Sequence, residues 1–498
     1  MWHPSDRQKY RFYEMFPGII VWVILLGSIL LSFIRPIWVI YFIIIFDLYW
    51  LIKVLYLSIL LIYAWRKYRK NLKINWREKA EKLPGYADIH HLVFFATYKE
   101  EIDVVGPTFE ALIKSDYPLH KLIVVLAGEE KDKDNFLKMA EEIKSRYADK
   151  FFKFLVTVHP KNLPDEISGK GSNLHFSGQE AQKIIDELGL PYEKIIVSSF
   201  DVDTCVHPLY LPYLTYVYLT HPDPTHCSYQ PVAVFNNNIW DSPALTRVVA
   251  RGTTFWLLTE LTKPHIYFTF SSHALSFKAL TDIGFWQKDV VSEDSRIFLQ
   301  CYNHYNGDYQ TVPLYMSVSM DTVYVGSIKK TLINQYKQIL RWGYGVENVP
   351  WMIWNLFRNK KMPFKKKIPP FWVQLEGSCT WATVPLLIFI LGNLPMRIAH
   401  LQNKTEAIVH NAPFVLEKLM TFTLVGLFLS AILSTILLPP KPQKHKITQY
   451  FFMIFQWLLF PITMIFFGSI PAGEGITRLM LGKYIGFRVT EKKRKVIK

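Results

Sequence analysis

Long apolar runs flank a more polar middle section, and this arrangement constrains the fold more than any other sequence feature. Residues 16–34 contain no charged side chain, and a second apolar run covers 37–65 after a break at Arg35 and Pro36. About 20 apolar residues in a helix cross the ~30 Å hydrocarbon core of a bilayer. Further runs at 371–394, 419–438 and 451–470 bring the expected number of spans to five.

Basic side chains border these runs and predict their orientation. Lysine and arginine outnumber aspartate and glutamate by 57 to 41, and many of them stand beside the first two runs: Arg7, Lys9, Arg11, Arg66, Lys67, Arg69 and Lys70. Such placement is typical of cytoplasmic loops. No small-residue cleavage site follows the first run, so residues 1–70 are expected to form an anchored hairpin with both ends in the cytoplasm.

Five spans would place the two ends of the chain on opposite sides, whereas the basic residues at 492–495 favour a cytoplasmic C-terminal end. An even number is therefore expected, with either one late segment re-entrant or one further helix. The run within 371–400 is long enough to contain a break, and Pro461 interrupts the last run. Asp47, Lys53 and Glu376 lie inside spans, where charged groups either pair with other helices or extend to the interface.

Two other features exclude alternatives. The excess positive charge is compatible with nucleic acid, but no RNP motif, zinc finger or arginine-rich arm accompanies it, so nucleic acid is not expected as a partner. The four cysteines, Cys205, Cys227, Cys301 and Cys379, have no metal-binding spacing and are expected to be free, buried thiols.

The middle section, residues 86–330, alternates short apolar runs with amphipathic helical patterns. Strands are predicted at 91–95, 122–126, 154–158 and 195–200, with helices of about 15 residues between them. This rhythm predicts a mostly parallel α/β sheet with crossover helices. Ligands of such sheets bind beyond the carboxyl ends of the strands, so the loop 97–101 and residues 201–203 are expected at that edge.

Two carboxylates, Asp201 and Asp203, end the fourth strand and point to the same side of an extended chain. They repel one another unless a cation lies nearby. Mg²⁺ or Mn²⁺ binds one or two carboxylates and completes its shell with phosphate oxygens and water, so the pair could hold a metal and a nucleotide diphosphate. A solvated strand end is the more common explanation of such a pair when it is taken alone.

Two shorter motifs accompany this pair. Lys170 lies between two glycines and suits a contact with a diphosphate, although a surface turn before a helix explains it equally well. Asp294 follows Ser292 and Glu293, and a carboxylate there could take a proton from a hydroxyl nucleophile. The same residues suit the start of a helix, and both explanations can hold together.

A helix predicted at 330–344 carries Gln338, Arg341 and Trp342 on one face. The arginine can grip a diphosphate and the indole can stack on a sugar ring. An interfacial helix with Trp and Arg anchors is the alternative, because membrane segments follow directly. The tail at 487–492 reads as a basic segment that meets anionic lipid when it is considered in isolation.

In this order, the motifs resemble the family 2 glycosyltransferases, particularly the membrane-integrated branch of cellulose, chitin and hyaluronan synthases. The resemblance covers nearly the whole chain, and its most specific elements are the Asp-x-Asp, Glu-Asp, Gln-x-x-Arg-Trp and terminal Phe-x-Val-Thr-x-Lys motifs. It implies an α/β GT-A-like (nucleotide-diphospho-sugar transferase) cytoplasmic domain inserted between α-helical transmembrane segments. The implied domains are a hairpin at 1–70, the catalytic domain at 86–330, interface helices at 331–368, membrane segments at 369–472 and a tail at 473–498.

The resemblance also implies a role for each motif residue. Tyr98 and Glu100 would line the base and ribose pocket, and Lys170 would contact the diphosphate. Asp201 and Asp203 would hold the nucleotide and Mg²⁺ or Mn²⁺, and Asp294 would be the general base of an inverting transfer. The diphosphate and the acceptor sugar would be bound by Gln338, Arg341 and Trp342. The mobile gating segment would contain Phe487, Val489, Thr490 and Lys492.

The sequence departs from the family pattern after the second strand, where Ala127, Gly128, Glu129 and Glu130 replace the usual Asp-Asp-x-Ser. A UDP-sugar is expected as the donor rather than a GDP-sugar. The leading function is transfer of a sugar to a growing polysaccharide, which could be coupled to export of that polysaccharide. The protein is expected to be a multi-pass protein of the plasma (inner) membrane. The alternatives are transfer of one sugar to a lipid acceptor and a non-catalytic membrane scaffold or transporter.

Overall fold

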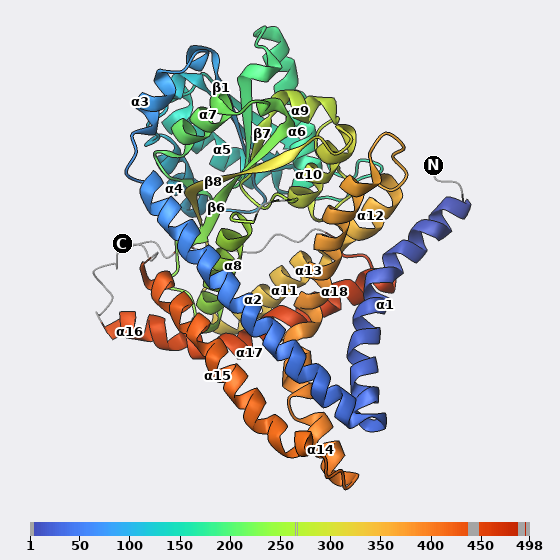
Figure 1. The fold of residues 1–498 in the computed structure, drawn as a ribbon. Coiled ribbons are helices and arrows are strands. Elements are labelled where there is room, and N and C mark those ends of the chain that lie inside the picture. Colours follow the sequence, from blue (N-terminus) through green and yellow to red (C-terminus); the bar gives the residue numbers. More distant parts are fainter. Residues whose placement is uncertain (1–3, 264, 266, 437–447, 487–493, 495–498) are drawn as a thin grey trace.

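The computed structural model describes residues 4–263, 265, 267–436, 448–486 and 494. A sheet domain stands above a set of long helices that extend away from it, and shorter helices lie between the two parts (Figure 1). The N-terminal helices and the C-terminal helices lie side by side beneath the sheet, so both flanks of the sequence build the same lower part.

One eight-stranded sheet organises the upper domain. Its strand order is β3-β2-β1-β4-β7-β6-β8-β5. The four strands predicted from sequence are confirmed as β1 (His90–Ala96), β2 (Leu122–Glu129), β3 (Lys153–His159) and β4 (Ile195–Asp201), all mutually parallel. Four strands that the sequence reading did not identify complete the sheet: β5 (Cys205–Val206), β6 (Cys227–Phe235), β7 (Ala274–Ser276) and β8 (Gln310–Met320). The short β7 runs antiparallel to both β4 and β6, and it joins the two halves of the sheet.

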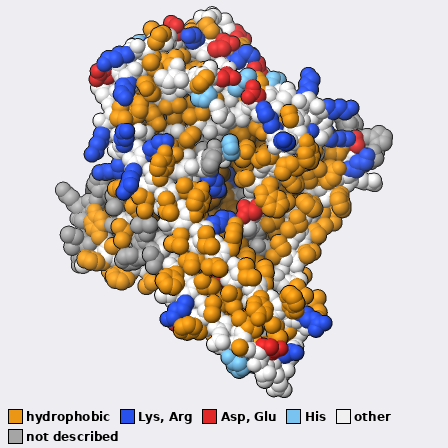
Figure 2. Space-filling view, in the orientation of Figure 1, with side chains coloured by type: hydrophobic (Ala, Val, Ile, Leu, Met, Phe, Trp, Pro, Cys, Tyr) orange, Lys and Arg blue, Asp and Glu red, His pale blue; other side chains and the backbone are white. Residues whose placement is uncertain are grey.

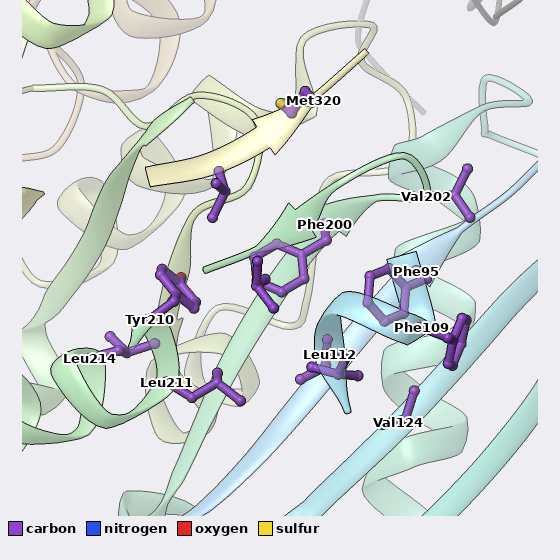
Figure 3. Close-up of a cluster of buried hydrophobic side chains, with 14 of the residues drawn as sticks. Phe95, Phe109, Leu112, Val124, Phe200, Val202, Tyr210, Leu211, Leu214 and Met320 are labelled. Carbon is purple, nitrogen blue, oxygen red and sulfur yellow. The ribbon is translucent and has the colours of Figure 1, made fainter. Parts of the chain in front are cut away.

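Alternating side chains of the central strands supply a core on each face of the sheet. In β1, Val93 and Phe95 enter one core, whereas Leu92 and Phe94 enter the other, as the two-residue period of a strand requires. The first core contains side chains of α4 (Ile102–Leu112), α5 (Lys133–Tyr147) and α7 (Tyr210–Thr220), and Figure 3 shows Phe95, Phe109 and Phe200 meeting within it. The second core contains side chains of α6 (Lys170–Glu187), α9 (Phe277–Asp282) and α10 (Glu293–His304).

Long apolar helices form the lower part of the molecule. They are α1 (Pro4–Ile34), α2 (Pro36–Asn71), α13 (Phe364–Leu391) and α15 (Ala407–Ile436). Within the described residues, four segments are long and apolar enough to cross a membrane: Asp6–Ile34, Pro36–Asn71, Phe364–Leu401 and Thr448–Met480. Hydrophobic side chains cover most of this part of the surface, whereas charged side chains gather higher up (Figure 2). The predicted run at 419–438 falls mostly within α15, and residues 437–438 lie outside the described part of the chain.

Two of the predicted apolar runs are interrupted in the structure. The expected break within 371–400 is confirmed, since α13 ends at Leu391 and α14 (Leu394–Leu401) begins after Gly392 and Asn393. The last run is also interrupted, because Pro461 starts α17 (Phe460–Met464) after α16 (Thr448–Phe455) and a short 3-10 turn. With α18 (Ile470–Met480), these helices run across the directions of α1, α2 and α15, beneath the sheet domain (Figure 1).

Three further helices lie between the sheet and the long apolar helices. They are α8 (Ala244–Glu260), α11 (Ile328–Gly343) and α12 (Asn348–Asn355), and a short α3 (Trp76–Glu81) leads from α2 into the sheet domain. Helix α11 packs closely on α18. At Gly343 the two helices are so near that an added Cβ would lie 2.6 Å from Ala472 Cα. The bounds of α11 confirm the amphipathic helix predicted at 330–344. It lies in the layer between the sheet and the long apolar helices.

The charged residues within the predicted spans have different environments. Lys53 Nζ of α2 lies 3.1 Å from Glu376 Oε1 of α13, which confirms pairing between helices for these two groups. Asp47 is buried, and its Oδ1 has no hydrogen-bond partner among the described residues. All four cysteines are free, as predicted, and Cys205 alone of them is only half-buried.

Candidate active site

The candidate site lies where the central parallel strands end. Ala96 of β1 stands opposite Asp201 of β4 in the strand register, and the amide N–H of Thr97 donates to the Ala127 carbonyl oxygen of β2 (2.8 Å). The loop after β1 and the carboxylates after β4 are thus neighbours at one sheet edge. This is the edge at which the sequence placed them.

Lys170 lies close to three carboxylates, two of which, Asp201 and Asp294, are predicted site residues. Its Nζ lies 2.8 Å from Asp201 Oδ1, 2.9 Å from Asp294 Oδ1 and 3.6 Å from Glu293 Oε1. Burial alone would lower the pKa of Lys170, but the surrounding negative charges outweigh burial and raise that pKa well above its usual value. The structure therefore brings a lysine together with three carboxylates that lie 31, 123 and 124 positions further along the sequence, and it keeps the lysine charged.

Local backbone features place this lysine. Helix α6 begins at Lys170, and the next residue, Gly171, lies directly against the start of α10. A Cβ on Gly171 would approach the Gln287 carbonyl oxygen to 2.9 Å and Glu293 Cβ to 3.2 Å. The glycine is needed because any side chain would push the two helix starts apart. The surface turn considered from sequence is wrong, since Lys170 is 9% exposed.

Asp203 is held on the other side of the strand end. Its Oδ2 accepts a hydrogen bond from the Asp321 amide (2.7 Å), and Asp321 directly follows β8. Arg494 donates to both carboxylate oxygens of Asp321 (2.8–3.1 Å) and to the Asp203 carbonyl oxygen (3.3 Å). A residue from the last five of the sequence thus reaches the backbone of the Asp-x-Asp motif.

These carboxylates fit a divalent metal of the Mg²⁺ or Mn²⁺ kind. The described residues contain no cluster of three or more His, Cys, Asp or Glu that could hold an ion without other ligands. Mg²⁺ does not require one, because it uses one or two carboxylates and takes its remaining ligands from water and substrate phosphates. Asp201 and Asp203 supply hard oxygen donors of this type.

The segment before β7 contains site residues that sequence reasoning missed. Ser271 Oγ donates to Asp201 Oδ2 (2.7 Å), and Thr269 Oγ1 donates to the Asp294 carbonyl oxygen (2.5 Å). His273 Nδ1 lies 3.0 Å from the Phe270 carbonyl oxygen, so Nδ1 carries the proton there. Burial lowers the pKa of His273, whose ring lies 3.8 Å from Asp294 Oδ1. The run of small polar residues between two apolar stretches was the available signal.

Glu347, which follows α11, anchors the Glu-Asp motif. Its Oε1 accepts hydrogen bonds from the amides of Val291 (3.0 Å) and Ser292 (2.8 Å) and from Ser292 Oγ (2.8 Å). Ser292 stands at the N-cap position of α10, as the sequence suggested, but its hydroxyl bonds Glu347 instead of capping the helix. Nothing in the local sequence of Glu347 marked it for this role.

The Gln-x-x-Arg-Trp motif faces the same region from α11. Gln338 is buried and accepts from Gln335 Nε2 (3.0 Å), and Trp342 packs 6.2 Å from the ring of Phe235. Burial and the Asp294 charge raise the pKa of Glu293, whereas the positive charges of Lys170 and Arg341 oppose that rise. Arg341 is therefore close enough to interact electrostatically with the Glu-Asp motif. A narrow cavity between α8 and α11 is lined by Asp321, Gln338 and Trp342 among others.

The loop after β1 folds on itself. Glu100 Oε2 accepts from the Tyr98 amide (2.6 Å) and from Thr97 Oγ1 (2.8 Å), while Lys99 adopts a left-handed backbone with φ 69°. Tyr98 and Glu100 are half-buried in this loop. The side chains at the ends of β2 and β3 lie at the same edge of the sheet.

The residues after the second strand, which depart from the family pattern, include a glutamate that contacts His159. Glu129 is buried at the end of β2 and its Oε2 lies 3.0 Å from His159 Nδ1, while Glu166 Oε1 lies 3.3 Å from Nε2 of the same ring. Burial alone would lower the pKa of His159, but Glu129 and Glu166 outweigh burial and raise it. The tail residues Phe487, Val489, Thr490 and Lys492 lie outside the described residues.

Comparison with known proteins gives one family match. The model of the family described as "Glycosyl transferase family group 2" matches residues 196–470, which include Asp201, Asp203, Asp294 and the motif of α11. No curated protein matches the sequence.

Solved structures of glycosyltransferases are similar at low identity. A mannosyltransferase from Pyrobaculum calidifontis, in complex with GDP-Man and Mn²⁺, is 15% identical with a TM-score of 0.42, covering 76% of this chain and 98% of that one. TarS 1–349 from S. aureus, in complex with UDP-GlcNAc, is 14% identical with a TM-score of 0.36, covering 67% and 90%. Glucosyl-3-phosphoglycerate synthase from Mycobacterium tuberculosis, in complex with Mg²⁺ and UDP, is 18% identical with a TM-score of 0.30, covering 51% and 82%.

Proposed function

Because the chain belongs to glycosyl transferase family group 2, we propose that it is an inverting, metal-dependent glycosyltransferase that transfers a sugar from a nucleotide-diphosphate sugar to a growing polysaccharide. The family and the GT-A-like sheet domain make it a glycosyltransferase. The observation that carries the finer proposal is the position of Lys170 within 2.9 Å of both Asp201 and Asp294. One buried cation thereby joins the proposed donor motif to the proposed base.

In the proposed reaction, Asp294 removes the proton of the acceptor hydroxyl, which attacks the anomeric carbon on the face opposite the leaving diphosphate. Asp201 and Asp203 would hold Mg²⁺ or Mn²⁺, which supplies positive charge to the diphosphate as it leaves. Lys170 adds fixed positive charge at the same place. Asp294 supplies a general base that is 24% exposed and can therefore meet an acceptor.

Other residues are assigned to binding. Tyr98 and Glu100 line the base and ribose pocket, where uridine is favoured over guanosine. Gln338, Arg341 and Trp342 bind the diphosphate and the acceptor sugar beside the cavity between α8 and α11. The tail 473–498 gates the site, and the contact of Arg494 with Asp321 supports that role.

We assign the membrane part to four spans, α1, α2, α13 with α14, and α15, with α16–α18 lying along the interface. This assignment gives an even number of spans and puts both chain ends and the catalytic domain in the cytoplasm, in agreement with the basic residues around 66–70. The protein would be a multi-pass protein of the plasma (inner) membrane, and the spans could export the product. The small number of spans favours a second candidate, transfer of one sugar to a lipid acceptor.

The test is release of nucleoside diphosphate by the detergent-purified protein, offered a panel of UDP- and GDP-sugars with Mg²⁺ or Mn²⁺. Asp203→Asn and Asp294→Asn are compared with Asp149→Asn, a matched change at an exposed position. The proposal expects release from one donor that EDTA and both site substitutions abolish and that the control retains. Sizing the product separates polymer from single transfer, and absence of both release and donor binding would favour a scaffold.

A further inference from the structure

Two neighbouring arginines of α8, of which Arg251 is buried and Arg247 half-buried, have no ionic partner among the described residues. Arg247 and Arg251 are one helical turn apart and share a face, and Arg251 is 6% exposed. Arg251 Nη1 donates to the Met453 carbonyl oxygen (2.8 Å), and Arg251 Nη2 and Arg247 Nη1 lie 2.8 and 3.3 Å from Met453 Sδ. The Nε atoms of both arginines are buried without a hydrogen-bond partner in the described structure. A thioether is a weak acceptor, so these donors are poorly satisfied.

No ion pair formed between described residues includes Arg247 or Arg251. Within the described structure, two like charges therefore stand side by side without a carboxylate partner.

This arrangement costs free energy unless an anion binds. A guanidinium keeps its proton in proteins, and burial together with the charge of Arg247 acts against the charged form of Arg251 by lowering its pKa. A buried charge without a partner is strongly destabilising. Two forked guanidinium groups match the geometry of a phosphate group, which would satisfy both charges and the remaining N–H donors.

The position of the pair indicates the source of such a phosphate. Met453 lies in α16, at the start of the apolar segment Thr448–Met480. The outer side of this helix exposes Phe451, Phe452 and Phe455 by 64–67%, and an interfacial helix buries such an apolar face at the boundary between headgroups and acyl chains. Helix α8 contacts the turn after α16 and also α17, and it descends from the sheet to this level (Figure 1). The two guanidinium groups therefore stand at the depth of lipid headgroups.

We propose that Arg247 and Arg251 form a binding site for the phosphate of a membrane lipid at the junction of α8 and α16. The site rests on the membrane integration proposed above, but not on the transfer reaction. It lies beside the catalytic domain, since Val249, Ala250 and Thr253 of the same helix line the cavity that contains Asp321 and Trp342. A phosphate-bearing lipid would there reinforce the contact between the sheet domain and the membrane helices.

The test uses the full-length protein in neutral detergent without a sugar donor, so its outcome is independent of catalysis. Thermal unfolding is followed by intrinsic fluorescence during titration with dioctanoyl phosphatidic acid, with dioctanoyl phosphatidylcholine and inorganic phosphate as the other arms. The expected result is a rise in Tm with phosphatidic acid that exceeds the rise in both other arms. Arg247→Gln/Arg251→Gln should weaken the response about 10-fold or more in lipid concentration, whereas Arg397→Gln, at an exposed arginine of α14, should respond like the parent.

Three results would overturn the proposal. Equal responses of the parent and the double variant would remove the arginines from the site. An equal response to phosphatidylcholine would indicate an apolar effect, and a full response to inorganic phosphate would assign the site to a soluble anion.

The variant Arg251→Met tests whether loss of the lipid response could result simply from loss of stability. It keeps the bulk of the side chain and removes the uncompensated charge, so its Tm without lipid should equal or exceed that of the parent while its response to phosphatidic acid is lost. A lower Tm without lipid would show that the protein alone satisfies Arg251, which contradicts the proposal.

Discussion

Lys170 is the residue on which the charge balance of the candidate site depends. It is 8% exposed at its side chain and lies within 3.6 Å of Asp201, Glu293 and Asp294. Lys170→Met would leave these carboxylates without their buried cation. We expect nucleoside diphosphate release to fall by about 100-fold or more and the unfolding free energy to fall by about 3–5 kcal/mol. Lys170→Arg, which keeps the charge, should retain most of the stability, and a Met variant as stable as the parent would contradict this account.

The adjacent carboxylates Glu293 and Asp294 are expected to respond differently to amidation. Glu293 is buried, and burial with the neighbouring Asp294 charge raises its pKa to about 8, so the folded protein favours its protonated form at neutral pH. Glu293→Gln imitates that form, and we expect its Tm at pH 7 to be close to that of the parent. Asp294→Asn should instead lower nucleoside diphosphate release by about 10²–10⁴-fold, because it removes the proposed general base.

Measurement of Tm against pH tests the same assignment. Because the folded pKa of Glu293 exceeds its unfolded value of 4.5, the folded protein binds an extra proton between these values and loses stability as the pH rises through them. The Gln variant should lose this part of the pH dependence. A Gln variant with the full dependence of the parent would show that another group is responsible.

At the scale of single elements, the contact between the starts of α6 and α10 sets the geometry of the site. Gly171→Ala would place a Cβ 2.9 Å from the Gln287 carbonyl oxygen and 3.2 Å from Glu293 Cβ. We expect a loss of about 1–3 kcal/mol of unfolding free energy and a loss of activity, because Lys170 moves with the helix start. Gly106→Ala in α4 is the matched control, since a Cβ there meets no atom within 4 Å and should be neutral or stabilising.

The ends of β2 and β3 are joined by a second titratable group. His159 lies between Glu129 and Glu166, and these carboxylates raise its pKa although burial opposes them. Its contribution to stability is complete below pH 6.5, the unfolded value, and is lost as the pH rises through the raised folded pKa. Tm should therefore decline above pH 6.5 in the parent, and this part of the decline should be absent in His159→Gln. The same decline in both proteins would exclude His159 as its cause.

These elements also show what the sequence could predict. The four parallel strands have continuous apolar runs, so period and composition located their ends within one residue, except that β2 continues three residues beyond its predicted end. The other strands were missed for physical reasons. Strand β7 has three residues, and β6 and β8 contain Pro231 and Pro313, which normally argue against an interior strand. The motif carboxylates were found by spacing, whereas Ser271, His273 and Glu347 reach the site only through tertiary packing, which local sequence does not encode.

At the scale of the whole molecule, the sequence located the apolar runs but not their directions in space. Hydropathy measures length and composition, and the segment Thr448–Met480 satisfies both criteria. Its interruption at Pro461 and its course beneath the sheet depend on contacts with α8, α11 and α13. The packing of Gly475 against the Leu340 carbonyl oxygen, where a Cβ would lie at 2.7 Å, is one such contact. The odd number of runs therefore does not require an odd number of crossings.

The pairing of Lys53 with Glu376 is expected to hold α2 against α13. Lys53 Nζ lies 3.1 Å from Glu376 Oε1 and 4.5 Å from the centre of the Trp50 ring. Under the membrane assignment proposed above, Lys53→Met would leave Glu376 without its partner at membrane depth, where an unpaired charge costs about 2.5–3.5 kcal/mol. Unfolding in lipid nanodiscs should show a Tm well below that of the parent. Lys53→Met/Glu376→Leu should recover most of the loss, because no charge then remains. If the double variant is no more stable than the single one, then α2 and α13 are held by packing around these positions and the ion pair contributes little.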